Sequence, residues 1–471
     1  MSRQTNLAKN TLILSIGTIL PKFGVFITLP ILTGCLTKTE YGIFDLVFAV
    51  FSMILPIATL KINVASFRFL IDERGNDSEV DSIISNTLIF TTAVSVLTLI
   101  PFFFFIPGNA LVRLLACVYM FVSLTNATMA LFLRGLGNNL DYSFSSLVNA
   151  SCKVLFIVIL LWGLNFGLPG AIASVLLASA SSMCFLTYKL RIFSRIDLSL
   201  FSPAVIKQML AYSWPNVLND LCWWVMGTCD RLLIVWFIGL PASAAYAVAH
   251  KIPGLLNIAN GTFTMAWYEN ASLAIRDKDK SQYYTRMFKS IFDLMAGLLG
   301  LIIASTPILF AILVKGDYSD AYNQMPILFM ASFFSIMNAF MAGIFVASKN
   351  MMGITKTTFI AAICNFVINI SLIRFIGIYA ASLSTVISYA IIGAIRMRDV
   401  KKLVNIHYDK RHIIFVVLFL TFMSGLCFVR NIYLDAANII MSIIFFTANN
   451  KGVMLGFWRK STGKLRKIFA K

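Results

Sequence analysis

Charged and strongly polar side chains interrupt stretches of this sequence that are otherwise apolar. A charge at the centre of a lipid bilayer costs about 2.5–3.5 kcal/mol on insertion scales, so such residues normally face a partner or a water-filled cavity. Most of them are cations, which suits the binding of an anionic group. We expect a binding cavity lined by Lys22, Asp45, Lys61, Lys153, Asn216, Asp220, Trp223, Asp230, Arg231, His250 and Lys251.

The cations of the first half differ in how easily they could reach a membrane surface. Lys22 follows Pro21 deep in an apolar stretch, and a proline there bends the helix and frees a backbone carbonyl. Lys61 and Arg68 lie near the end of the next stretch, so a cavity position and snorkelling to headgroups both remain open. For Lys153 the alternatives are a cavity position and a buried ion pair.

Among the apolar stretches, residues 208–238 contain the most polar side chains. These polar residues recur at steps of three or four, which places them on one stripe of a helix. Asp230 and Arg231 could form a structural ion pair or a gate that an anion opens. Trp223 could stack on a polar or apolar substrate or pack between helices. His250 could carry protons or be a satisfied core residue.

The elements that must position these residues are membrane helices. Of the 471 residues, 59% are hydrophobic and only 13% are charged, whereas soluble domains carry about 25% charged residues. We predict an all-α polytopic membrane protein with about fourteen spans of roughly 20 residues and no soluble catalytic domain. The expected spans are 10–32, 42–64, 83–107, 110–133, 143–164, 168–190, 208–238, 243–266, 287–314, 323–347, 355–373, 377–396, 412–430 and 434–456.

The distribution of charge argues for a membrane function and against nucleic-acid binding, although the net charge is +19. With both termini in the cytoplasm, roughly 29 of the Lys and Arg residues lie on the cytoplasmic side and about 5 outside. Basic clusters, including the tail 459–471, are then topology signals beside anionic lipid. The eight cysteines lack metal-ligand spacing, and we expect no metal, cofactor or catalytic residue.

Short matches between the two halves indicate an internal repeat of about 205 residues. Leu7–Asn10 corresponds to Leu210–Ser213, and Gly167–Ser174 corresponds to Gly377–Ser384. Two six-helix lobes, 1–205 and 206–400, would then be related by a pseudo-twofold along the membrane normal with a cleft between them, followed by a final helix pair in 401–471. Convergent loop composition is the alternative.

Several short motifs resemble the oligosaccharide-flippase family, the polysaccharide-transporter branch of the multidrug/oligosaccharidyl-lipid/polysaccharide (MOP) exporter superfamily. The resemblance covers nearly the whole chain in length and helix pattern. The motifs are Leu7–Thr11, Glu40–Asp45, Tyr212–Asn216, Trp223–Trp224, Asp230–Arg231, Tyr246, Ala249–Pro253 and Ala266–Trp267.

This resemblance implies a flippase of the bacterial inner membrane that moves undecaprenyl-pyrophosphate-linked oligosaccharide for O-antigen, capsule or exopolysaccharide synthesis. It implies headgroup contacts by Lys22 and Lys61, and a match of Asp45 to the family's acidic residue. A polysaccharide polymerase and chain-length proteins are the protein partners that it suggests. A multidrug cation antiporter and a polytopic polymerase or ligase are the alternatives, but the first needs a carboxylate-rich cavity and the second a larger outer loop.

Overall fold

The computed structural model is helical throughout the part of the chain that it describes, which is residue 17 and residues 20–451. Eleven helices among these residues are long and apolar enough to cross a membrane, which confirms the prediction of an all-α multi-pass membrane protein. They are α3 (Lys38–Thr59), α5 (Asp77–Phe105), α6 (Ala110–Gly135), α7 (Asn139–Ile157, continued by the π-helical turn η2, Val158–Gly163), α8 (Gly167–Leu190), α14 (Lys280–Leu313), α15 (Ser319–Ala347), α16 (Met351–Ile376), α17 (Tyr379–Leu403), α18 (Lys410–Leu426, continued by η4, Cys427–Val429) and α19 (Ile432–Asn449).

The other three predicted spans, 10–32, 208–238 and 243–266, correspond to short or interrupted helices. The described part of the first is η1 (Leu20–Phe23) with α2 (Gly24–Cys35), and residues 10–16, 18 and 19 lie outside the described chain. The second is divided into α10 (Pro203–Gly227) and α11 (Cys229–Phe237), and the third into α12 (Leu240–Ala249) and α13 (Leu255–Ala274). The two divided segments, 208–238 and 243–266, carry seven of the predicted site residues.

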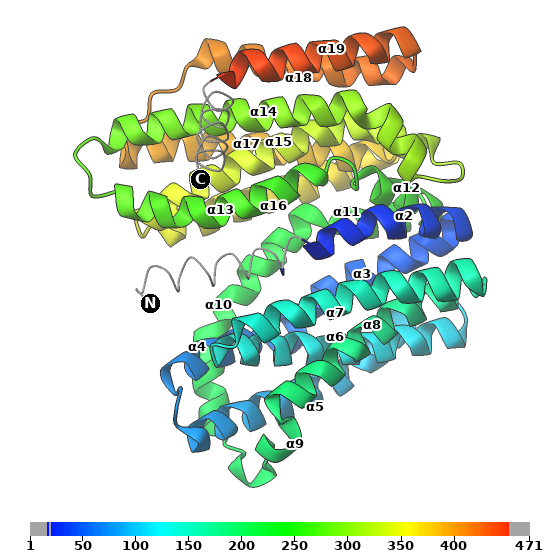
Figure 1. The fold of residues 1–471 in the computed structure, drawn as a ribbon, viewed down its shortest axis with the longest axis vertical. Coiled ribbons are helices and arrows are strands. Elements are labelled where there is room, and N and C mark those ends of the chain that lie inside the picture. The colour runs from blue at the N-terminus through cyan, green and yellow to red at the C-terminus, as the bar shows by residue number, and fades with distance from the viewer. Residues whose placement is uncertain (1–16, 18–19, 452–471) are drawn as a thin grey trace, which may run out of the picture. The chain divides into compact units, whose positions relative to one another are not determined.

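The chain forms two compact units, which we describe separately: residues 1–247 with 313–317, and residues 248–312 with 318–471. In the first unit α6, α7 and α8 pack side by side, as Figure 1 shows, and the short helix α4 (Ile62–Asp72) packs on α6. The apolar residues Ile62 and Leu70 of α4 are fully buried in this core. Helix α10 contacts α3, α4 and α5 and so belongs to the first unit. The lobes 1–205 and 206–400 and the final segment 401–471 remain a prediction about the duplicated sequence.

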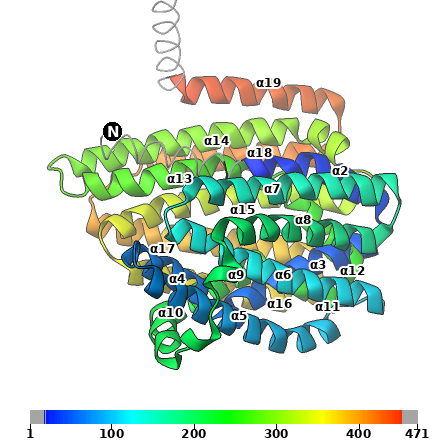
Figure 2. The ribbon, with the colours of Figure 1, turned by 60° about the horizontal axis from the view of Figure 1, so that its bottom comes forward.

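The second unit has an aromatic core around Trp267 of α13. The ring of Trp267 stacks on Phe340 of α15 with ring centroids 4.3 Å apart, and its Nε1 donates a hydrogen bond to the Phe340 carbonyl at 2.8 Å. Helices α15 and α16 both pack on α17, and Figure 2 shows α19 at the outer edge of this unit. The basic tail 459–471 lies outside the described residues.

Candidate functional site

The start of α3 is fixed by local hydrogen bonds that place Asp45 two turns later. The Thr37 side chain accepts from the Glu40 backbone N–H, and the Glu40 carboxylate accepts from the Thr37 N–H at 2.9 Å, which is a capping box. A Cβ on Gly42 would lie 2.5 Å from the Leu240 carbonyl oxygen, so only glycine permits this approach of α3 to α12. Within the Glu40–Asp45 motif, Glu40 therefore caps α3 and Gly42 permits close helix packing.

Lys61 does not lie in the last turns of a continuous span, as the sequence predicted, but at a break between α3 and α4. Leu60 and Lys61 both adopt left-handed backbone conformations, with φ of 45° and 57°. A left-handed conformation costs a residue other than glycine about 1–2 kcal/mol. Backbone strain of this kind concentrates at functional sites. The break therefore depends on its neighbours to hold it.

Helix α10 supplies those neighbours within the first unit. The Ser213 hydroxyl donates to the Leu60 carbonyl at 2.8 Å, and Trp224 Nε1 donates to the Ala49 carbonyl of α3 at 2.9 Å. Lys61 Nζ lies 2.6 Å from Asp220 Oδ2, with side chains 18% and 36% exposed. Asp220 therefore neutralises the cation that the break presents.

Arg231 makes the second ion pair of this region, with Asp45. Its Nη1 lies 3.1 Å from Asp45 Oδ2, and the aspartate side chain is only 7% exposed. The predicted continuous stripe is wrong at this point because α10 ends at Gly227 and Arg231 lies on α11. We name the Lys61–Asp220 and Arg231–Asp45 pairs the paired-charge cluster, although the two pairs lie apart: from Asp45 to the end of α3 at Thr59 is 14 residues, or about 21 Å.

Asp230, the neighbour of Arg231, points to a different partner. It is 2% exposed, and its Oδ2 accepts a hydrogen bond of 2.9 Å from the Tyr246 hydroxyl. A buried carboxylate needs such a donor because burial removes its hydration. Arg231 and Asp230 thus face two different helices, α3 and α12, and the structure supports separate pairings instead of one Asp230–Arg231 pair.

The remaining predicted site residues are spread over several elements. Lys22 lies in η1 and is exposed, Asn216 is exposed on α10, and Trp223 is 40% exposed. His250 and Lys251 do not lie on a continuous helix, as predicted, but in the turns between α12 and α13. The structure therefore joins four of the predicted residues in two separate pairs. Arg68 pairs with Asp72 on the exposed side of α4, and this carboxylate raises the pKa of Arg68.

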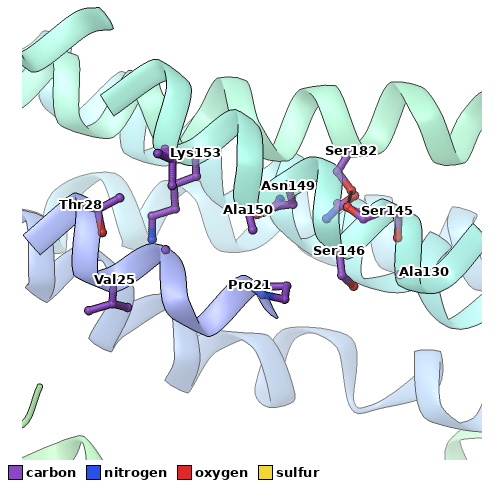
Figure 3. Close-up of a pocket in the computed structure, with 13 residues that line it drawn as sticks. Pro21, Val25, Thr28, Ala130, Ser145, Ser146, Asn149, Ala150, Lys153 and Ser182 are labelled. Carbon is purple, nitrogen blue, oxygen red and sulfur yellow. Dashed lines mark hydrogen bonds between the residues drawn. The ribbon is translucent and has the colours of Figure 1, made fainter. Parts of the chain in front are cut away.

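Lys153 lies in a separate cavity within the first unit. This cavity has a volume of about 400 Å³ and is bounded by α2, α6, α7 and α8. The Lys153 side chain extends from α7 toward α2, as Figure 3 shows, and its ammonium group lies 5.5 Å from the Phe48 ring centroid. The polar residues that line the cavity with it are Thr28, Asn126, Ser145, Ser146, Asn149 and Ser182.

The sequence did not single out two polar contacts of the second unit. Arg396 is fully buried, and its guanidinium donates to the Thr357 and Thr358 hydroxyls and to the Asn338 and Ile354 carbonyls. His412 lies in the first turn of α18, with its Nε2 2.6 Å from Oδ1 of the buried Asp293. A signal for Arg396 was its own position at the end of the expected span 377–396.

The fold is that of known membrane transporters. An outward-facing multidrug resistance MATE transporter of the MOP superfamily covers 84% of this chain and 96% of its own, with 16% identity and a TM-score of 0.57. An inward-facing MATE structure gives 14% identity and a TM-score of 0.63, covering 83% of this chain and 98% of its own. A MOP-superfamily transporter from Pyrococcus furiosus, described as having a binding pocket of reversed polarity, gives 15% identity, a TM-score of 0.56 and coverage of 84% and 96%.

The sequence family follows from residues 7–268, which match the model of the polysaccharide biosynthesis protein family, Polysacc_synt. The match covers more than half of the chain, so the protein belongs to this family. It is a multi-pass membrane protein with a MATE-like fold, and the resemblance inferred from the sequence is confirmed. A search of curated protein sequences finds no significant match.

Proposed function

We propose that the protein is a flippase that translocates undecaprenyl-pyrophosphate-linked oligosaccharide across the bacterial inner membrane by alternating access. The product would supply O-antigen, capsule or exopolysaccharide synthesis, and both termini would face the cytoplasm. Membership of the polysaccharide biosynthesis family and the transporter fold support this proposal. In the same proposal, α10–α11 and α12–α13 each complete one interrupted crossing, which gives fourteen spans with the first helix.

The paired-charge cluster is the observation that carries the proposal. Lys61 is held by Asp220 of α10 at 2.6 Å, and Arg231 of α11 is held by Asp45 of α3 at 3.1 Å. A pyrophosphate is too short to reach both pairs at once, but it can replace the carboxylate of one pair as the acceptor of charge-assisted hydrogen bonds. Ligand binding would then open one contact as it forms another, which couples recognition of the headgroup to movement of α10 and α11.

Charge neutrality of the empty cluster explains why such cations can lie within an apolar protein. Two isolated charges in this environment would each carry a large desolvation penalty, and pairing them offsets part of it. The exposed Lys22 on η1 would add a further contact for the phosphates. In this scheme Lys22 binds the headgroup together with either Lys61 or Arg231, whereas Asp220 and Asp45 hold these two cations in the empty state.

A multidrug cation antiporter is the second candidate because opening the cluster also releases two carboxylates. Asp45 and Asp220 could then bind a cationic compound in place of Lys61 and Arg231. The two functions predict opposite preferences for substrate charge. Drug susceptibility that rises when the protein is deleted would favour the antiporter, and loss of surface polysaccharide would favour the flippase.

The test compares cation variants in cells that depend on this protein for surface polysaccharide. Lys61→Gln and Lys22→Ala should abolish surface polysaccharide at unchanged membrane expression, because both remove a headgroup contact. Arg68→Ala is the matched control, since Arg68 lies on α4, which begins directly after Lys61, and pairs with Asp72 at the surface. Full polysaccharide in the Lys61→Gln cells would contradict the proposal.

A further inference from the structure

The cavity around Lys153 has a polar wall, although it lies among predominantly apolar helices. Ser145, Ser146, Asn149 and Lys153 follow one another at helical spacing on α7, so they form one stripe of this helix. Lys153 lies 14 residues beyond the helix start at Asn139, which corresponds to about 21 Å along the axis. Polar groups at that depth normally face a protein partner or a water-filled cavity, and these groups line a cavity.

The wall offers mainly hydrogen-bond acceptors. The hydroxyls of Ser145 and Ser146 donate to the Tyr142 carbonyl at 2.7 and 3.3 Å, so their remaining lone pairs are acceptors. The Ser182 hydroxyl donates to the Ser145 carbonyl at 3.2 Å. Asn126 Oδ1 is buried and accepts no hydrogen bond from any described residue. A ligand that brings several hydroxyl donors fits this wall.

Lys153 brings the complementary chemistry to the same cavity. An ammonium group has three donors and no acceptor, so it favours a carboxylate or another anionic oxygen. The cavity volume of about 400 Å³ falls in the range of about 300–1,000 Å³ that is usual for small-molecule sites. The segment next to Lys153 continues as the π-helical turn η2, a feature that is frequent at functional sites.

We propose that this cavity is a glycan subsite that takes one acidic sugar residue of the translocated oligosaccharide. The sugar hydroxyls donate to the acceptor wall, and the sugar carboxylate accepts from Lys153. This inference rests on the proposed flippase function, but it concerns a different place from the paired-charge cluster. It assigns selection of the sugar to the cavity and binding of the pyrophosphate to the cluster.

The first test measures whether water and an acidic sugar enter the cavity. In a full-length variant with its eight cysteines replaced, we introduce Asn149→Cys and label it with a negatively charged, membrane-impermeant thiol reagent. D-glucuronate should slow this labelling at least about threefold, and D-glucose should have a smaller effect. Ser151→Cys is the control, because Ser151 lies on the same helix, is exposed and does not line the cavity.

The second test asks whether Lys153 selects the carboxylate. Adding Lys153→Gln to the Asn149→Cys protein should remove the difference between glucuronate and glucose, while the melting temperature stays near that of the parent. Protection by inorganic pyrophosphate alone would assign the cavity to the headgroup, and labelling insensitive to every probe would exclude a ligand site. Either result overturns the glycan subsite, whereas the proposed flippase function is judged separately by the Lys61→Gln and Lys22→Ala variants.

Discussion

The two units of this protein bury charge in different ways. In the first unit, Lys61 and Arg231 are paired with carboxylates across an interrupted helix. In the second unit, Arg396 is fully buried and is held by two hydroxyls and two carbonyls, all of them neutral acceptors. A carboxylate can be replaced by another anion, but a set of fixed backbone and hydroxyl acceptors on packed helices cannot be exchanged. The two units thus differ in whether the partner of a buried cation can be exchanged for another anion.

The surroundings of the charges follow the same division. The first unit has a strained break at Leu60 and Lys61 and a polar cavity around Lys153. The second unit has a cavity of about 210 Å³ lined almost entirely by aromatic and aliphatic residues such as Phe288, Phe333 and Met341. An apolar cavity of this kind does not attract water or sugar. This cavity therefore differs in chemistry from the cavity around Lys153, which is lined by hydroxyl and amide groups.

The largest expected effect is on stability and comes from breaking the Arg231–Asp45 pair on one side. Asp45→Asn leaves a largely buried guanidinium without its carboxylate, which should lower the free energy of unfolding by about 3–5 kcal/mol. The double variant Asp45→Asn with Arg231→Gln should recover most of this loss, because neither residue is then charged. Denaturant unfolding in detergent measures both, and equal instability of the two variants would contradict an ion pair at this position.

A smaller effect is expected when the packing of the second unit is disturbed. A Cβ on Gly343 would lie 2.4 Å from Trp267 Nε1, in the aromatic core. Gly343→Ala should therefore cost about 1–3 kcal/mol of stability. Gly425→Ala in α18 is the matched control because no heavy atom lies within 4 Å of its added Cβ. If Gly343→Ala melts like the control, the aromatic core of the second unit is less tightly packed than this contact requires.

The smallest effect concerns pH and lies at the surface of the second unit. Asp409 caps α18, and the hydrogen bond from the His412 backbone N–H holds the pKa of this carboxyl below its usual value of 3.8. Because the folded pKa is lowered, the carboxylate contributes its full stabilisation above the unfolded pKa of 3.8. This contribution is lost as the pH falls through the lower pKa of the folded state. Asp409→Asn keeps the cap without titrating, so its melting temperature should fall less than that of the wild type between neutral pH and about pH 3.

The sequence predicted the membrane class and the family because both depend on composition and short motifs. It could not predict the breaks at Lys61, Thr228 and His250, since the apolar pattern continues through them. The pairing of Lys61 with Asp220 joins residues 159 positions apart, and sequence spacing carries no information about such contacts. The polar stripe of Ser145, Ser146, Asn149 and Lys153 has a helical periodicity in the sequence, but a site role is predicted from the sequence only for Lys153.

The most direct test of the central claim is transport of a fluorescent undecaprenyl-pyrophosphate-linked oligosaccharide in proteoliposomes containing the wild type or the double variant Lys61→Gln with Asp220→Asn. The double variant removes the cation without leaving a buried unpaired charge, so it should fold like the wild type. We predict that the wild type translocates the lipid and that transport by the folded double variant falls at least about tenfold, which is about 1.4 kcal/mol. Transport by the double variant at the wild-type rate would show that Lys61 and Asp220 only stabilise the fold.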